Sequence, residues 1–479
     1  MSKKMLKLSI LLLVFSLLLS TIVGCSKAQD ETTQADQQQD ATEQAEDKQQ
    51  PEEEPEETEQ EEPEEEIRDL GGRVIKVAAW WDMTPQGGTP SGDRQVARRE
   101  EMEKKYNFKF EYVNIPWEEV TETYTASVMA GDPAADIFTV EDNWLPGLVN
   151  KGFVQPLDEF FDFSDDKWDS LTKELSTFDG KVYGMATGKW WPRAMMFYNK
   201  EIFARENLPD PYELMMNGEW TWEKMREIAK AATKDTDGDG VIDQWGIGGI
   251  DMDIGLIYSN GATFADIKDG KAVLNLRDPK VVEALNFYYE LAHVDKSLYS
   301  KFTYGEEPPW DIAATMFQDG KIAMFWYQYW KIDDFKDNMA DDYGLLLPPY
   351  GPSDPDKKYK PLVTGHNFQT IPKNVKNPED VAFIWNLWTE PYPEDLEDPD
   401  AWMEAHYDRV REERSLEVLK YMYDNDCFAP VGLFGACQPA IEVWWGGQDD
   451  LLKGEKTVAQ IIDEKFDALQ AAFDDYLAN

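Results

Sequence analysis

The acidic segment 26–66 most constrains what this chain can fold into, because it confines globular structure to the residues that follow. It consists almost entirely of Gln, Glu, Asp, Thr, Ala and Pro, with 18 acidic residues against 2 basic ones. Such a segment offers too little apolar surface to offset its ordering entropy, and its like charges favour an extended chain. We therefore expect residues 25–66 to form a disordered tether, with a regulatory tail as the alternative. The folded part is expected to start near residue 67.

The first 24 residues have the pattern of a secretory signal. Lys3, Lys4 and Lys7 precede an apolar run over residues 8–23, which ends at Gly24-Cys25. A basic start, an apolar stretch and a small residue before the cleavage point are typical of exported proteins. A cysteine at that point indicates lipidation of Cys25 and anchoring on the extracellular face of the cytoplasmic membrane. The alternative is an ordinary signal peptide with an incidental cysteine.

The charge of the folded part excludes some classes of partner. Of the formal net charge of −47, segment 26–66 contributes −16 and the basic start +3, which leaves −34 on residues 67–479. A surface this negative disfavours nucleic acid, whose binding requires cationic side chains against phosphates. Two cysteines remain in this part, Cys427 and Cys437. They form either a disulfide, as exported proteins allow, or two buried thiols.

The pattern of apolar residues predicts alternating strands and helices. Roughly 410 residues exceed one ordinary domain, so two lobes are expected. A strand–helix–strand–helix–strand order at the start predicts a parallel sheet covered by helices. The expected strands are 74–80, 108–113, 136–140 and 321–326, and the expected helices are 94–106, 117–130, 221–233, 279–294 and 378–389.

Polar and aromatic side chains follow two of these strands directly. In open α/β sheets, ligands lie outside the carboxyl ends of the strands. The first strand is followed by Trp80, Trp81 and Asp82, and the third by Glu141, Asp142, Asn143 and Trp144. We expect both groups to lie at one rim of the first lobe.

Several stretches resemble the family 1 extracellular solute-binding proteins of bacterial sugar ABC importers. The resemblance covers nearly all of residues 72–479, and its motifs occur in the family's order. The matching stretches are Met129–Phe138, Gly152–Asp158, Lys181–Gly184, Phe197–Lys200, Met316–Met324 and Thr364–Phe368.

The resemblance implies an α/β, two-lobed periplasmic-binding-protein-like fold of type II, in which each lobe is a mostly parallel sheet flanked by helices. The ligand cleft would lie between the lobes, which close on the ligand by hinge motion. Lobe 1 is expected to comprise residues 67–192 and 350–405, and lobe 2 residues 193–349 and 406–479. The implied function is capture of a sugar, with an oligosaccharide favoured, and its delivery to the permease subunits of an ABC importer. A monomer without catalytic activity is expected.

Aromatic residues beside polar groups are the candidate sugar contacts. The apolar C–H face of a sugar packs on an indole or phenol ring, and its hydroxyls need convergent polar partners. For any single ring, ordinary core packing is the alternative, and for the polar side chains it is a solvated surface. Besides the two groups above, the candidates are Trp190, Trp191, Arg193, Trp326, Tyr327, Tyr329, Trp330, His366, Asn367, Trp444 and Trp445. Arg193 suits a hydroxyl, a uronate carboxylate or an ion pair between the lobes.

One acidic loop has the spacing of a calcium site. Asp235, Asp237, Asp239 and Asp243 alternate with other residues around a glycine at the turn, and Val241 would add its carbonyl oxygen. The twelfth position, which usually supplies a bidentate Glu, is Gly246. The loop is therefore either an incomplete structural Ca²⁺ site or an acidic solvated turn.

Other functions stay open at this point. A secreted glycoside hydrolase would need two carboxylates at a catalytic separation, and no pattern singles out such a pair. Neither Gly-x-Ser-x-Gly nor a phosphate-binding loop occurs. A peptide, amino acid or metal chelate could occupy the same fold. Signalling to a membrane sensor is a further alternative to transport.

Overall fold

The structure is a computed structural model that describes residues 68–478, except 189–191, 270, 305–308, 310, 364–366 and 399. The predicted signal segment, Cys25 and most of the acidic tether lie outside the described residues. Residues 66–479 form one compact unit. None of the described helices is long and apolar enough to cross a bilayer.

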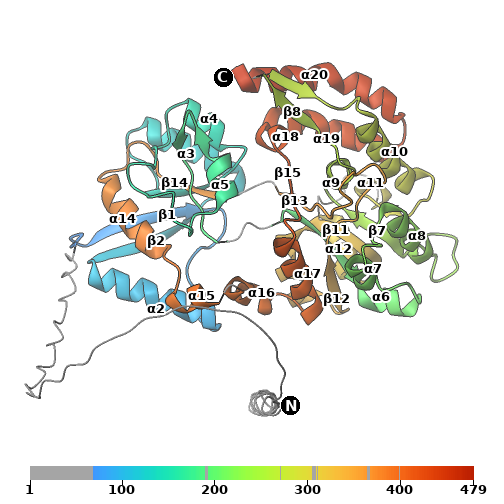
Figure 1. Cartoon of the computed structure of the whole chain (residues 1–479), viewed down its shortest axis with the longest axis horizontal. Helices are drawn as coiled ribbons and strands as arrows, with labels where there is room; N and C mark the ends of the chain where they lie inside the picture. Colours follow the sequence, from blue (N-terminus) through green and yellow to red (C-terminus); the bar gives the residue numbers. More distant parts are fainter. Residues whose placement is uncertain are drawn as a thin grey trace, which may run out of the picture. The chain divides into compact units, whose positions relative to one another are not determined.

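The first sheet has four strands in the order β14-β3-β1-β2 (Figure 1). Strands β1, β2 and β3 are parallel to one another, and β14 returns antiparallel to β3. These are β1 (Arg73–Ala79), β2 (Phe108–Asn114), β3 (Ile137–Glu141) and β14 (Asn367–Thr370). The helices and small strands of this part are α2 (Pro90–Lys105), η1 (Trp117–Glu119), α3 (Val120–Met129), α4 (Leu145–Asn150), α5 (Ser170–Leu175), β4 (Thr177–Phe178), β5 (Lys181–Val182) and α14 (Pro378–Trp388).

Successive side chains of the strands in this sheet point to opposite faces of the sheet. Both faces are apolar, and helices cover each of them. Ile75 and Ile137 point into a cluster with Met102 of α2 and Trp385 of α14. Their strand neighbours on the opposite face, such as Phe138, pack instead against residues of α3 and α4. A sheet buried on both faces leaves only its strand ends accessible to a ligand.

The second sheet has five strands in the order β10-β7-β11-β6-β12. Strands β10, β7 and β11 are parallel, whereas β6 runs antiparallel to both β11 and β12. These are β6 (Ala194–Asn199), β7 (Trp245–Gly249), β10 (Leu298–Tyr299), β11 (Ile322–Gln328) and β12 (Tyr343–Leu346). The remaining strands pair as β8 (Ala265–Lys268) with β9 (Lys271–Leu274), and as β13 (Leu362–Val363) with β15 (Ala429–Pro430).

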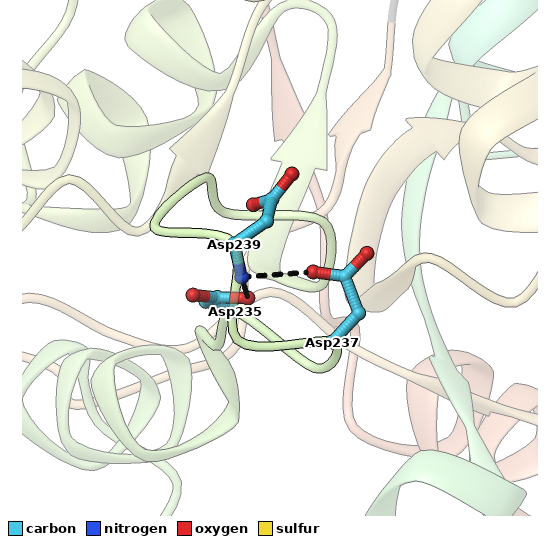
Figure 2. Close-up of side chains that lie close together, drawn as sticks. All are labelled: Asp235, Asp237 and Asp239. Carbon is cyan, nitrogen blue, oxygen red and sulfur yellow. Dashed lines mark hydrogen bonds between the residues drawn. The ribbon is translucent and has the colours of Figure 1, made fainter.

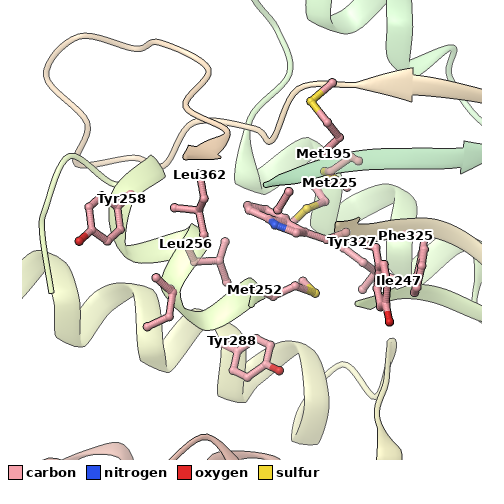
Figure 3. Close-up of a cluster of buried hydrophobic side chains, with 14 of the residues drawn as sticks. Met195, Met225, Ile247, Met252, Leu256, Tyr258, Tyr288, Phe325, Tyr327 and Leu362 are labelled. Atoms are coloured by element: carbon pink, nitrogen blue, oxygen red, sulfur yellow. The ribbon is translucent and has the colours of Figure 1, made fainter. Parts of the chain in front are cut away.

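Many helices surround this second sheet, and the C-terminal ones share its core. They are α6 (Lys200–Arg205), α7 (Pro211–Met216), α8 (Trp222–Ala232), α9 (Met252–Ser259), α10 (Pro279–His293), α11 (Lys301–Tyr304), α12 (Ile312–Gln318), η2 (Tyr329–Lys331), α13 (Ile332–Asn338), α17 (Glu413–Asp424), α18 (Leu433–Ala436), α19 (Gln438–Lys453) and α20 (Val458–Ala478). The connection between α14 and α17 contains α15 (Pro393–Glu397), η3 (Ala401–Met403) and α16 (Glu404–Tyr407). Figure 3 shows part of the core, where Met252 and Leu256 of α9 lie near Tyr288 of α10.

The elements expected from the sequence agree with the structure to within a few residues at most ends. The exception is the helix expected over 117–130, which is divided into η1 and α3. The lobe boundaries stay predictions. Tyr359 and Leu362 pack in the core of the second sheet, although residues 350–405 were assigned to lobe 1. Cys427 and Cys437 are both buried and free, which agrees with two buried thiols.

Asp253 and His406 are buried titratable side chains, and each has a hydrogen-bonding partner. Asp253 of α9 accepts from Trp444 Nε1 and Gln448 Nε2 of α19, both at 2.7 Å. Burial raises the pKa of Asp253 to about 6, although both of these hydrogen bonds lower it. His406 Nδ1 lies 2.7 Å from the Tyr329 hydroxyl, and burial lowers the pKa of His406 to about 4.

The raised pKa of Asp253 predicts a pH-dependent cost in stability. In the folded protein this carboxyl keeps its proton up to about pH 6, whereas in the unfolded chain it loses it near the usual 3.8. As pH rises through this window, the wild type should therefore lose unfolding free energy relative to Asp253→Asn, by up to about 3 kcal/mol. Urea titrations of both proteins between about pH 4 and 7 measure this difference. Asp319→Asn, at an exposed position after α12, is the matched control, and an equally large trend there would contradict the assignment.

Candidate functional site

Four tryptophans form a continuous row at the carboxyl ends of β1, β2 and β3. Trp80 and Trp81 follow β1, Trp117 follows β2 and Trp144 follows β3. Ring centroids lie 4.9 Å apart for Trp80–Trp81, 5.4 Å for Trp80–Trp144 and 5.3 Å for Trp117–Trp144. Trp81 is 39% exposed and Trp117 is 43% exposed. We call these four residues the tryptophan row. It presents apolar ring surface at the sheet edge where ligands bind in such folds.

Trp117 was absent from the residues expected to contact a ligand. It was assigned to the first position of a helix over 117–130, where an aromatic residue needs no further explanation. Pro116 precedes it in an extended conformation and η1 begins at Trp117 itself. Its position in the sequence could have identified it, since β2 ends at Asn114. Ligands lie outside the carboxyl ends of strands in such sheets, and this applies to β2 as it does to β1 and β3.

Glu141 lies directly beside the tryptophan row. It is the last residue of β3, and Trp117 Nε1 donates to its Oε1 at 3.2 Å. Burial raises the pKa of Glu141, while the charge of Arg193 and the bond from Trp117 act in the opposite direction. Glu141 also pairs in register with Asn367 on β14. Glu141 and Asn367, both predicted ligand contacts, are therefore neighbours across the two strands.

Two asparagines near Glu141 have side-chain carbonyl oxygens with no donor among the described residues. They are Asn143 Oδ1 and Asn367 Oδ1, and both oxygens are buried. The amide nitrogen of the first one, Asn143 Nδ2, donates to Gln438 Oε1 of α19 at 2.9 Å. Asp142 accepts from the backbone N–H of Asn143. Buried acceptors are normally satisfied, so these two oxygens suit a ligand that supplies O–H or N–H groups.

Arg193 connects this edge to the second sheet. Its Nε donates to Asp251 Oδ2 at 3.3 Å, and each side chain is 30% exposed. Burial lowers the pKa of Arg193, but the charges of Asp251, Glu141 and Asp142 outweigh burial and raise it. Asp251 comes two residues after β7, in the left-handed region with φ 54°. Asp251 was not predicted, because β7 was not recognised as a strand.

Other predicted contacts lie inside the second core. Trp326 and Tyr327 of β11 are fully buried, and Tyr329 and Trp444 are almost fully buried. Tyr329 contacts His406 and Trp444 donates to Asp253, as described above. By contrast, Trp330 is 50% exposed and Trp445 is 52% exposed. Asp82 is exposed and accepts from the backbone N–H of Thr84. Trp190, Trp191 and His366 lie outside the described residues.

The acidic loop expected to bind calcium connects α8 to β7, at the amino end of that strand. Asp235, Asp237 and Asp239 each place a carboxylate oxygen within 4.8 Å of the other two (Figure 2). Asp235 also accepts from the backbone N–H groups of Gly238, Asp239 and Gly240, which holds the loop in this conformation.

The remaining positions of this loop contribute less. Asp243 is not part of the cluster, because it accepts from the backbone and hydroxyl of Thr236. Gly246 has no side-chain oxygen to offer, and Val241 is exposed. Three carboxylates therefore fit a hard cation, with fewer ligands than a full calcium loop has.

Known structures share this fold. An ABC substrate-binding protein from Listeria monocytogenes in complex with cycloalternan is similar at a TM-score of 0.61, with 18% identity, over 85% of this chain and 98% of that one. The maltose/maltodextrin-binding domain MalE from Bdellovibrio bacteriovorus, bound to maltotriose, is similar at 0.57, with 18% identity over 85% and 100%. UgpB from Mycobacterium tuberculosis, in complex with glycerophosphocholine, is similar at 0.62, with 15% identity over 85% and 100%.

These likenesses confirm the predicted fold class, a two-lobed α/β protein of the type II periplasmic-binding kind. The sequence profile of the bacterial extracellular solute-binding proteins matches residues 89–385. That match spans well over half of the chain and includes strands of both large sheets. The chain belongs to the bacterial extracellular solute-binding protein family.

Proposed function

We propose that this protein captures a carbohydrate, in the form of an oligosaccharide, and delivers it to an ABC importer. The tryptophan row is the observation that carries this proposal. Indole rings pack against the C–H faces of sugars, and polar groups beside them bind the hydroxyls. Four rings in contact along one edge suit several linked sugar units better than one.

The polar groups around the row support the same ligand class. Glu141 accepts a hydrogen bond, and the side-chain carbonyl oxygens of Asn143 and Asn367 have no donor among the described residues. Sugar hydroxyls supply such donors in number. A ligand that contacts both Glu141 and Asp251 would engage groups that follow strands of both sheets. Its binding energy would then favour the closed arrangement of the lobes.

The related structures support a sugar, with one alternative. Cycloalternan and maltotriose are the ligands named for two of them, and glycerophosphocholine for the third. A small solute other than a sugar is therefore the second candidate, and a peptide belongs to the same class of alternative. A family of binding proteins disfavours a glycoside hydrolase.

The location proposed for the protein is the extracellular face of the cytoplasmic membrane. The basic start, the apolar run and Gly24-Cys25 support lipidation at Cys25. Segment 26–66 would then act as a tether between the lipid and the folded part. The permease subunits of the importer are the proposed protein partner, and a monomer is the proposed state.

A panel of mono- and oligosaccharides tests the sugar directly. Thermal unfolding of the chain from Ser26 onward is measured with each glycan, because a ligand at a hundred times its dissociation constant adds about 2.7 kcal/mol to stability. We expect a rise of several degrees in Tm with one family of glycans. A rise with glycerophosphodiesters or peptides and with none of the glycans would contradict the proposal.

Removal of one ring tests the tryptophan row. Because Trp117 is half-exposed and packs on Trp144, Trp117→Ala should leave folding intact. It should weaken glycan binding roughly tenfold, through loss of ring contact and of the bond to Glu141. Calorimetric titration with the glycan found in the panel measures the change. Trp388→Ala, on α14 away from the strand ends, is the control, and equal affinity of Trp117→Ala and wild type would contradict the assignment.

We also propose that the loop Asp235–Asp243 holds a structural Ca²⁺. The convergence of Asp235, Asp237 and Asp239 supports it, and the position before β7 places it away from the tryptophan row. An ion there would neutralise mutual repulsion of the three carboxylates and stabilise the loop.

Calcium should raise the Tm of the wild type, and a chelator should reverse the rise. In Asp237→Asn the rise should largely disappear, since one of three carboxylates is neutral, whereas Asp319→Asn should respond as the wild type does. Melting curves in millimolar Ca²⁺ and in a chelator measure both. An undiminished rise in Asp237→Asn would place the ion elsewhere.

A further inference from the structure

We propose that the binding site acts as a charge filter, which accepts uncharged or amine-bearing glycans and excludes those with carboxylate, sulfate or phosphate groups. This inference rests on the proposed function and specifies its class of substrate. It depends on the balance of charges around the tryptophan row, and on which hydrogen-bonding roles remain open there.

Several carboxylates of the site lie at the carboxyl ends of strands of the first sheet. Glu141 is the last residue of β3 and Asp142 follows it, beside Trp117 and Trp144. The negative charges of both carboxylates help to raise the pKa of Arg193. Asp82, after β1, adds a third acidic group at the same edge.

Carboxylates also approach from the second sheet. Asp251 follows β7, and Asp311 precedes α12. Burial raises the pKa of Tyr327, and the charges of Asp311 and Asp251 raise it further. The Tyr327 hydroxyl is itself buried and has no hydrogen-bonding partner among the described residues. The ends of strands from both sheets are therefore acidic.

The described cations at these strand ends are already engaged. The charge of Arg193 lowers the pKa of Glu141, and Arg193 donates a hydrogen bond to Asp251. Lys331 lies 3.6 Å from Asp311 Oδ2 and 2.7 Å from Asp334 Oδ2, with 11% of its side chain exposed. Each cation thus has at least two carboxylates, and the net charge of the described groups is negative.

The open hydrogen-bonding positions near the row are mostly acceptors. Within the part of the chain that the structure describes, Asn143 Oδ1 and Asn367 Oδ1 lack donors, and the Glu141 carboxylate accepts one side-chain hydrogen bond, from Trp117. A hydroxyl or an ammonium group supplies donors to such positions. A ligand carboxylate, sulfate or phosphate supplies only acceptors when ionised, and it adds repulsion in a partly desolvated region where charges are poorly screened.

A matched set of glycans tests the filter. The neutral glycan found in the panel is compared with two derivatives in which its C6 hydroxymethyl groups are oxidised to carboxylates or replaced by aminomethyl groups. Dissociation constants of the chain from Ser26 onward are measured by calorimetry at about 20 mM and about 0.5 M NaCl. We expect the acid to bind at least tenfold more weakly than its parent at low salt, and the amine at least as tightly as the parent. Because salt screens the repulsion, the dissociation constant of the acid divided by that of the parent glycan should be smaller at high salt than at low salt.

Two variants distinguish charge from shape. Glu141→Gln keeps an acceptor for Trp117 and removes one negative charge. It should therefore lower the ratio of the two dissociation constants, acid to parent, severalfold. Asp251→Asn frees Arg193 for the ligand and should lower this ratio further. Glu101→Gln, an exposed position of α2, removes the same charge away from the site and should leave the ratio as in the wild type.

The outcomes separate this inference from the function beneath it. Equal affinity for acid and parent would overturn the charge filter and leave carbohydrate capture intact. A ratio of dissociation constants that changes neither with salt nor in Glu141→Gln and Asp251→Asn would also overturn the charge filter and leave carbohydrate capture intact, since the discrimination would then be steric. Absence of binding by every glycan would overturn the proposed function and the filter with it.

Discussion

The structure depends on one constraint, the burial of both faces of each large sheet. Alternate side chains of β1 and β3 enter two separate apolar clusters, one with α2 and α14 and the other with α3 and α4. Side chains within such a strand are committed to packing. Residues at the carboxyl ends of the strands and just beyond them are less constrained by that packing. They include the whole tryptophan row and Glu141, and they are the ones that can serve a ligand.

The charged side chains at these strand ends then determine the electrostatic character of the site. The folded part carries a large excess of acids, and two of them act on Arg193: Asp251 accepts a hydrogen bond from its guanidinium, and the charge of Glu141 helps to raise its pKa. A partly buried cation that is shared by carboxylates from two sheets resists displacement, since removing either partner leaves charge uncompensated. Arg193 is also tied through its backbone, as its N–H donates to Leu362 and its carbonyl accepts from Tyr329. Its position directly before β6 fixes it in the structure of the site and also makes it part of the charge balance there.

Polar groups in the second core have a different role. Asp253 and Trp444 join α9 to α19, and Tyr329 joins η2 to His406 in the connection before α17. Such contacts are costly to leave unmade in a dry interior, so they specify which helices pack together. They also explain why aromatic residues that resemble sugar platforms in the sequence are not all available to a ligand.

The sequence by itself determined the local elements and much of the first-sheet edge. Runs of apolar residues and their breaks are local properties, so the expected strands and helices agree closely with the observed ones. Trp80, Trp81, Trp144 and Glu141 were placed at one edge because parallel strands end together. What the tertiary structure decided was the exposure of each aromatic residue. Trp326 and Trp445 are both members of aromatic pairs, yet one is fully buried and the other is half-exposed, because burial depends on the helices packed from distant parts of the chain. The same physical reason applies to Trp117 and Asp251, whose neighbours Glu141 and Arg193 are remote in the sequence and are brought to them only by the folding of both sheets.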